Sequence, residues 1–426
     1  GDADALFEVG AAILQKFPNG EQTPGVSSAL GQTATARYEF DKARAWLDRA
    51  AHQATDDAQA RAIFLSVAEL ELRLGDPQAA IDACRAALTR AGQPSARAEV
   101  FRTLALVVER SFDPPDVVRA LQPYRNTSPE IDSLLGLSLV ISGQVDDGEA
   151  VLAAAVSQAS ASARAVARAQ LGLAEANLGY LRSFAPSPQL DAIDELIGLV
   201  ELTVQGYLTA ARQPEPDLSL AALARLATAT SIAADKLEAA GVPPDLPPAE
   251  RKMLAGALQQ RIAGLRSGHD QALAECANRA RATWMLTASG RACLTGVLPD
   301  QLPVDPVGQA ARRAASPAVG EARDRLSADP ADVAALREVG AAFLAAGDGH
   351  AARMAFGTAV AEASQPEDLV QLAAAHRAVG DRVAAAEALG RAHAAGHAPA
   401  TQALVGLLGE LGLPDEAGRL KGGPDE

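Results

Sequence analysis

The sequence predicts an all-α fold in which helical hairpins repeat along the chain. Small residues recur at nearly constant spacing, and most are followed by a glycine and then by a second helical pattern. The alternation of polar and apolar residues that is typical of strands never extends beyond a few residues. Apolar residues make up 48% of the 426 residues, which is enough to build a large buried core.

The clearest repeat lies near the C-terminus. Its first helix is predicted to carry Gly340 at the point where it crosses the second helix, because a small side chain lets two helix axes approach closely. Gly347 is predicted to supply the left-handed conformation that ends the first helix. The predicted buried face of the second helix contains Ala352, Phe356 and Ala359.

The same frame recurs eight times, and its copies are identified by their small residues. These are Gly31, Ala68, Ala105, Gly136 and Gly172, then Gly340, Ala373 and Gly406. Their spacings are 37, 37, 31 and 36 residues, then 33 and 33. Predicted glycine turns follow at Gly75, Gly143, Gly179, Gly347, Gly380 and Gly412. The copy at Ala105 is degenerate, because its turn contains Pro114-Pro115.

This frame resembles the tetratricopeptide repeat (TPR), a helical hairpin of about 34 residues. The resemblance covers residues 1–185 and 318–422. It implies a TPR-like α-solenoid, which is a right-handed superhelix of helix pairs with an extended concave face. We therefore expect three segments: an N-terminal TPR array over 1–185, a non-canonical long-helix middle block over 186–317, and a C-terminal TPR array with a capping helix over 318–426.

The middle block departs from the repeat period. Long helices are predicted over 190–212, 218–240 and 249–281 or beyond, and a proline-rich break over 298–306 ends the block. The block resembles the long-helix insert of exported TPR proteins in bacterial envelope, secretion and motility systems, where a Pro-Pro-x-Leu linker also precedes a long amphipathic helix. The resemblance implies a periplasmic or outer-membrane-associated protein. A lipid anchor attached before Gly1 would fit that location. A cytoplasmic TPR adaptor is the alternative.

The cysteines bear on this choice of compartment. Cys84 is predicted to be a buried core thiol. Cys276 and Cys293 are 17 residues apart, which on one unbroken helix places them about 25 Å apart, too far for a disulfide. The chain would have to reverse near Trp284 for a bond to form, and the nearest helix-breaking pair, Ser289-Gly290, lies off-centre. The sequence leaves a disulfide and two free thiols as alternatives, and a disulfide would indicate an oxidising compartment.

The net charge of the chain and the motifs that it lacks exclude several classes of function. The chain carries 38 Lys and Arg against 53 Asp and Glu, a net charge of −15, so nucleic acid is not an expected partner. No stretch approaches the 18 uninterrupted apolar residues of a membrane span. No nucleotide-binding or hydrolase motif occurs, and the neighbouring Ser267, His269 and Asp270 would not converge on one substrate. His393 and His397, with His376 one helix earlier, are expected to face solvent near helix ends rather than to bind a metal.

We therefore predict no catalytic residue, cofactor or metal ligand. The predicted function is a non-catalytic scaffold that docks protein partners of a bacterial cell-envelope assembly. An enzyme, or a regulatory subunit of one, with a site in the middle block is an alternative.

The TPR resemblance also implies where a partner would bind, because in that family the first helix of each pair lines the concave face. Counting from each small residue selects a set of predicted groove positions. These are Leu65, Glu69, Leu72, Leu137, Val140, Arg337, Leu344, Val370 and Arg377. Ala341 stands where the family's carboxylate clamp has Asn, so a chaperone-tail clamp is not expected. The alternative is that these apolar side chains pack against a neighbouring repeat or the middle block.

Overall fold

The structure is a computed structural model that describes residues 3–18, 20, 22–305 and 311–422. Within these residues it contains twenty-one α-helices, one short 3-10 helix and no strand. The chain divides into two compact units, one formed by Gly1–Ser111 with Val307–Glu426 and the other by Phe112–Pro306. The three-segment division drawn from the repeat period stays a prediction.

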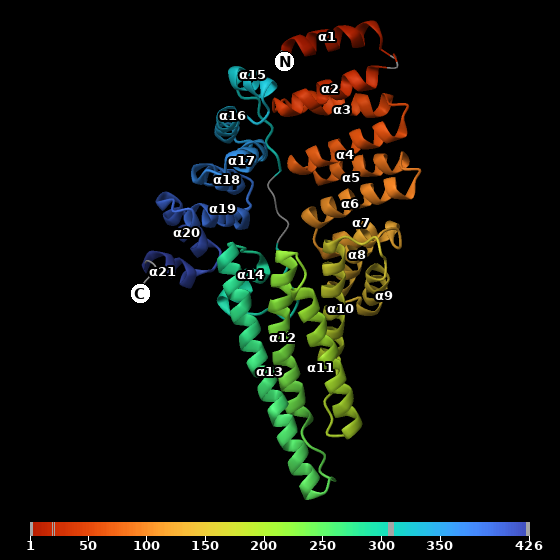
Figure 1. The fold of residues 1–426 in the computed structure, drawn as a ribbon, viewed down its shortest axis with the longest axis vertical. Helices are drawn as coiled ribbons and strands as arrows, with labels where there is room; N and C mark the ends of the chain where they lie inside the picture. The colour runs from red at the N-terminus through yellow and green to blue at the C-terminus, as the bar shows by residue number, and fades with distance from the viewer. Residues whose placement is uncertain (1–2, 19, 21, 306–310, 423–426) are drawn as a thin grey trace. The chain divides into compact units, whose positions relative to one another are not determined.

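The N-terminal half of the first unit is a succession of six helices, each packed against the next (Figure 1). Their bounds are α1 (Ala3–Lys16), α2 (Thr23–Ala36), α3 (Phe40–Gln53), α4 (Asp57–Arg73), α5 (Pro77–Thr89) and α6 (Pro94–Ser111). Asp56 and Asp76 cap α4 and α5, because their carboxylates accept hydrogen bonds from the backbone N–H groups of Ala58 and Ala79.

The C-terminal half of the first unit is a second succession of hairpins. Its helices are α15 (Gly320–Ala328), α16 (Val333–Ala345), α17 (Gly349–Ala363), α18 (Pro366–Ala378), α19 (Arg382–Ala394), α20 (Ala398–Glu410) and α21 (Pro414–Gly422). The turns at Gly347 and Gly380 have the predicted left-handed conformation, with φ of 84° and 82°. Asp348 and Asp381 then cap the second helices.

The second unit contains the longest helices. The helices of this unit are α7 (Pro114–Leu121), η1 (Gln122–Tyr124), α8 (Pro129–Ile141), α9 (Val145–Val156), α10 (Ala163–Ser183), α11 (Leu190–Ala211), α12 (Pro216–Ala240), α13 (Pro248–Thr283) and α14 (Ala288–Thr295), of which α10 to α13 are the longest. Helices α11, α12 and α13 confirm the three long helices expected in the middle block. α12 packs against both α11 and α13, so most of its residues are buried (Figure 1). No helix in the described ranges is both long enough and apolar enough to cross a bilayer.

Close helix crossings occur at the predicted small residues. A Cβ atom added to Gly31 would lie 2.6 Å from Leu47, and one added to Gly136 would lie 2.6 Å from Leu152. A Cβ atom on Gly340 would lie 2.9 Å from the ring of Phe356. Because each contact joins the two helices of one hairpin, these positions confirm the packing rule behind the repeat. The chain is a TPR-like α-solenoid.

Two predicted positions are wrong. Gly179 is not a turn, because α10 continues through it to Ser183 and buries Leu178 and Leu181 beyond the expected end of the helix. Gly406 is not a crossing point, since it is exposed and a Cβ atom there would have no neighbour within 4 Å. Helix α20 buries its leucines instead, which are Leu404, Leu407 and Leu408.

A disulfide joins Cys276 of α13 to Cys293 of α14, with 5.8 Å between their Cα atoms. The chain reverses at Trp284, which adopts the left-handed conformation with φ of 53°. Gly290 lies inside α14, where it packs against the carbonyl of Met285, and does not break the helix. The remaining thiol, Cys84, is buried, and burial raises its pKa to about 12.

We expect one free thiol in denatured, unreduced protein and three after reduction, as measured with a thiol-reactive dye. Replacing Cys276 and Cys293 together by Ala should lower the free energy of unfolding of the second unit by about 3 kcal/mol, because the bond closes a loop of 17 residues. The measurement is urea unfolding followed by Trp284 fluorescence in a Trp46→Phe background. Three free thiols before reduction would contradict the bond.

Gly340→Ala and Gly406→Ala form a matched pair, since both glycines lie inside helices of the first unit. Gly340→Ala should lower the free energy of unfolding by about 1 to 3 kcal/mol, because the ring of buried Phe356 must move. Gly406→Ala should raise it by about 0.5 to 1 kcal/mol, because it only gains helix propensity. Urea unfolding curves measure both, and equal effects would refute the packing rule.

Candidate functional site

The two halves of the first unit are joined by an aromatic cluster. Tyr38 and Phe40 flank the start of α3, and Phe343 lies on α16, about three hundred residues later. The ring centroids of Phe40 and Phe343 lie 6.1 Å apart, and Tyr38 lies 5.5 Å from Phe40 and 6.3 Å from Phe343. All three side chains are buried, so this cluster removes a large apolar area from water.

Charged groups surround the aromatic cluster. The guanidinium of Arg312 lies 5.1 Å from the Phe40 ring centroid and pairs with the buried carboxylate of Asp348 at 2.8 Å. Arg37 pairs with Asp324 at 3.2 Å and donates a hydrogen bond to the Ser327 hydroxyl at 2.9 Å. These charged contacts connect α2 and α3 with the segment 312–343. Together with the aromatic cluster they form the contact between the two halves of the first unit, which we call the joint.

A second contact between the halves lies further along the stack. The buried His350 ring of α17 packs against Gly75, the left-handed turn residue between α4 and α5. A Cβ atom on Gly75 would overlap that ring, so only glycine satisfies both the turn and the contact. Beside it, the Arg353 guanidinium donates a hydrogen bond to the backbone carbonyl of Arg73 at 3.0 Å.

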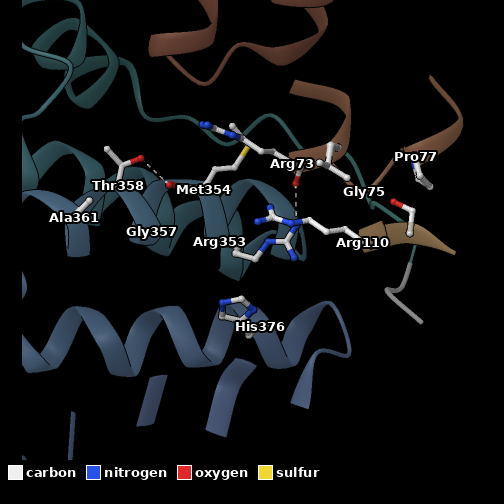
Figure 2. Close-up of a pocket in the computed structure, with 12 residues that line it drawn as sticks. Arg73, Gly75, Pro77, Arg110, Arg353, Met354, Gly357, Thr358, Ala361 and His376 are labelled. Atoms are coloured by element: carbon white, nitrogen blue, oxygen red, sulfur yellow. Dashed lines mark hydrogen bonds between the residues drawn. The ribbon is translucent and has the colours of Figure 1, made fainter. Parts of the chain in front are cut away.

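A cleft of about 590 Å³ lies next to this second contact (Figure 2). It is lined by α4, α5 and α6 on one side and by α17 and α18 on the other, so residues far apart in sequence meet here. Leu72, Met354 and Ala361 supply apolar lining. The charged lining consists of the arginines Arg73, Arg110 and Arg353, and the imidazole of His376 lines the same space.

The cleft is electropositive. Of the described residues that line it, none is Asp or Glu. Burial lowers the pKa of Arg353 below its usual value, and the positive charge of Arg110 lowers it further. The nearby carboxylate of Asp381 acts in the opposite direction and raises it. The carboxylate of Asp381 lies 3.4 Å from Nδ1 of His376. Burial would raise the pKa of Asp381, but His376, the Ala384 N–H and Arg353 together hold it below the usual range.

A second candidate site is a groove of about 800 Å³ on the C-terminal hairpins. Arg337 and Ala341 of α16 and Glu367 of α18 line it. Arg337 donates two hydrogen bonds to the buried carboxylate of Asp368, at 2.6 and 2.8 Å. This bidentate pair ties the first helices of two neighbouring hairpins together.

The predicted groove positions divide into three groups. Arg337 lines the C-terminal groove, while Leu344 and Val370 are half-buried on the same helices and Arg377 is exposed, 3.5 Å from Glu410. Leu72 lines the cleft instead, and Glu69 is exposed on α4.

The third group differs from the prediction that these positions line an open groove. Leu65, Leu137 and Val140 are only 8%, 7% and 7% exposed, so they offer no open surface. Leu137 and Val140 pack into apolar clusters of the second unit with residues of α10, which is the packing alternative left open by the sequence.

Other chemistry suggested by the sequence has no site in the described residues. No group of three or more His, Cys, Asp or Glu side chains within the described ranges is arranged to hold a metal. His393 bonds to the Thr401 hydroxyl, and His397 lies 3.7 Å from Glu367. A hollow of about 290 Å³ between α12 and α13 contains His269 and Asp270, but His269 Nδ1 is occupied by the carbonyl of Ala227 at 2.8 Å.

Sequence reasoning missed the arginines of the cleft. Arg73 and Arg110 end helices α4 and α6, where cations are ordinary, and Arg353 lies in the middle of α17. Nothing in their spacing signals that they meet. Only the docking of the two halves of the first unit places them around one cavity.

Comparisons with known proteins leave the family open. No protein-family model matches the chain, and no curated protein matches it. Among solved structures, the chain is similar to one titled "Structure of Naa15/Naa10 bound to HypK-THB", with 15% identity and a TM-score of 0.32 over 96% of this chain and 64% of that one. It is also similar to yeast Tom70, with 12% identity and a TM-score of 0.24 over 98% of this chain and 90% of that one. These similarities carry no inference about function.

Arg337 and Arg377 provide a test of which groove cation is structural. Arg337→Ala should lower the free energy of unfolding by about 1 to 2 kcal/mol, because the buried Asp368 carboxylate loses its partner. Arg377→Ala should change it by less than about 0.5 kcal/mol, since its pair with Glu410 is exposed. Urea unfolding measures both, and a large loss for Arg377→Ala would contradict this assignment.

Proposed function

We propose that the protein is a helical-repeat scaffold that binds a protein partner along the groove of α16 and α18. One observation carries the proposal. Arg337 and Ala341, which the repeat pattern assigns to a concave face, line one cavity of about 800 Å³ together with Glu367.

The groove surface is suited to a peptide segment. Val333 lines the groove and is half-buried, so part of its apolar side chain remains available to a ligand. Leu344 and Val370 are half-buried on the same two helices. Arg377 adds an exposed cation on the same helices. A helix or extended segment with an apolar face would bury this surface, at about 25 cal/mol per Å² before the cost of ordering the ligand.

We further propose that the protein acts in an oxidising compartment, as part of a bacterial envelope assembly. The Cys276–Cys293 disulfide supports the compartment, because such bonds persist mainly outside the reducing cytosol. The cytoplasmic adaptor remains the alternative, and the thiol count described above separates the two. The assembly rests on the resemblance of the middle block alone.

Photo-crosslinking from defined positions tests the groove. A photoreactive amino acid at Ala341 should capture a partner from cells of the source organism, whereas one at Arg391, which is exposed on α19 away from the groove, should not. The captured protein is then purified and titrated by calorimetry. Val333→Asp should weaken its binding at least about tenfold, because a charge replaces a half-buried apolar side chain that lines the groove.

Arg337 is kept unchanged in these experiments, since its loss would disturb Asp368 and the groove itself. Equal crosslinking from positions 341 and 391, or unchanged affinity in Val333→Asp, would reject the groove as the binding site.

A further inference from the structure

The cleft of the first unit is a second site, separate from the groove on α16 and α18. We propose that it binds the carboxylate of an acidic, partly apolar protein segment through Arg73, Arg110 and Arg353. The proposal does not depend on the groove, because the cleft and the groove have no lining residue in common.

The first argument is charge convergence. Arg73, Arg110 and Arg353 come from three helices, and all three line the same cavity. Figure 2 shows the side chains of Arg110 and Arg353 lying close together. Positions at helix C-termini are ordinary for Arg73 and Arg110 taken one at a time, and Arg353 is held at the cleft by its hydrogen bond to the Arg73 carbonyl. Together they place three guanidinium groups around one space. A bound anion would offset the repulsion among them.

The second argument is the chemistry of the lining. Leu72, Met354 and Ala361 favour a ligand that is partly apolar. None of the described lining residues is Phe, Tyr or Trp, the large aromatic side chains on which nucleobases commonly stack. A chain with a net charge of −15 also repels nucleic acid at long range. An apolar side chain next to a carboxylate satisfies both parts of the lining.

The third argument is geometry and size. A guanidinium presents a planar fork that matches a carboxylate, which makes arginine the preferred cation for this contact. A cleft of about 590 Å³ lies in the size range of sites for small ligands and short peptide segments. The carboxylate can belong to a Glu or Asp side chain or to a chain terminus, and the experiment distinguishes these sources.

The probe is a dye-labelled peptide of alternating Leu and Glu with an amidated C-terminus. It is titrated with the full chain and followed by fluorescence anisotropy. We expect saturable binding that weakens as salt is raised, because the attraction is electrostatic. The Leu and Gln counterpart, also amidated, should bind at least tenfold more weakly. The same Leu and Gln peptide with a free C-terminus tests the chain terminus as the source of the carboxylate.

Variants locate the site. Arg110→Gln should weaken binding of the Leu and Glu peptide at least tenfold, and Arg353→Lys should weaken it less, since it keeps the charge but loses the fork. Arg102→Gln is the matched control, because Arg102 is exposed on the same helix and does not line the cleft. Circular dichroism confirms that each variant is folded.

Several results would overturn the proposal. These are no saturable binding, equal affinity for the Glu and Gln peptides, or equal affinity in Arg110→Gln and the unchanged chain. Displacement of the peptide by inorganic phosphate at lower concentration than by acetate would assign the site to phosphate instead. Loss of binding in Val333→Asp but not in Arg110→Gln would place the peptide in the groove, which would contradict this proposal and leave the proposed function standing.

Discussion

The first unit depends on the contact that joins its two halves. Tyr38, Phe40 and Phe343 bring segments from opposite ends of the chain into one buried cluster. A solenoid of hairpins needs contacts only between neighbouring repeats, so nothing in the repeat itself requires this joint. Because the joint exists, His350 reaches Gly75, and the arginines of α4, α6 and α17 surround one cleft. The most distinctive surface of the unit follows from a long-range contact.

A buried ion pair has a similar role in the second unit. Arg225 of α12 is only 1% exposed and binds both carboxylate oxygens of Glu175 on α10, at 2.6 and 3.0 Å. The same guanidinium donates hydrogen bonds to the carbonyls of Pro299 and Asp300, at 2.9 and 3.1 Å. Desolvating such a pair is costly and offsets its Coulomb attraction, so the pair is not by itself evidence of added stability. Its consequence is positional, since it holds the proline-rich segment after α14 against α12.

The polar contacts also separate structural charges from available ones. Arg337 lies at a predicted groove position, yet both of its hydrogen bonds go to a buried carboxylate, and its charge serves the packing of α16 on α18. Arg110 is exposed at the end of α6 and faces the cleft. Both arginines line a cavity, but they differ in what they offer a ligand, because the hydrogen bonds of Arg337 go to the buried Asp368 carboxylate whereas Arg110 is exposed.

The sequence by itself determined the hairpin repeat, the crossings at Gly136 and Gly340, and the long helices of the middle block. These features depend on contacts within a few tens of residues, where periodicity and small side chains leave a readable pattern. Only the tertiary structure decided that Trp284 reverses the chain so that Cys276 meets Cys293, and that Leu65, Leu137 and Val140 are buried. It also decided which arginines share a cleft. Those outcomes depend on how distant helices dock, and the free energy of docking is spread over many side chains that have no common spacing.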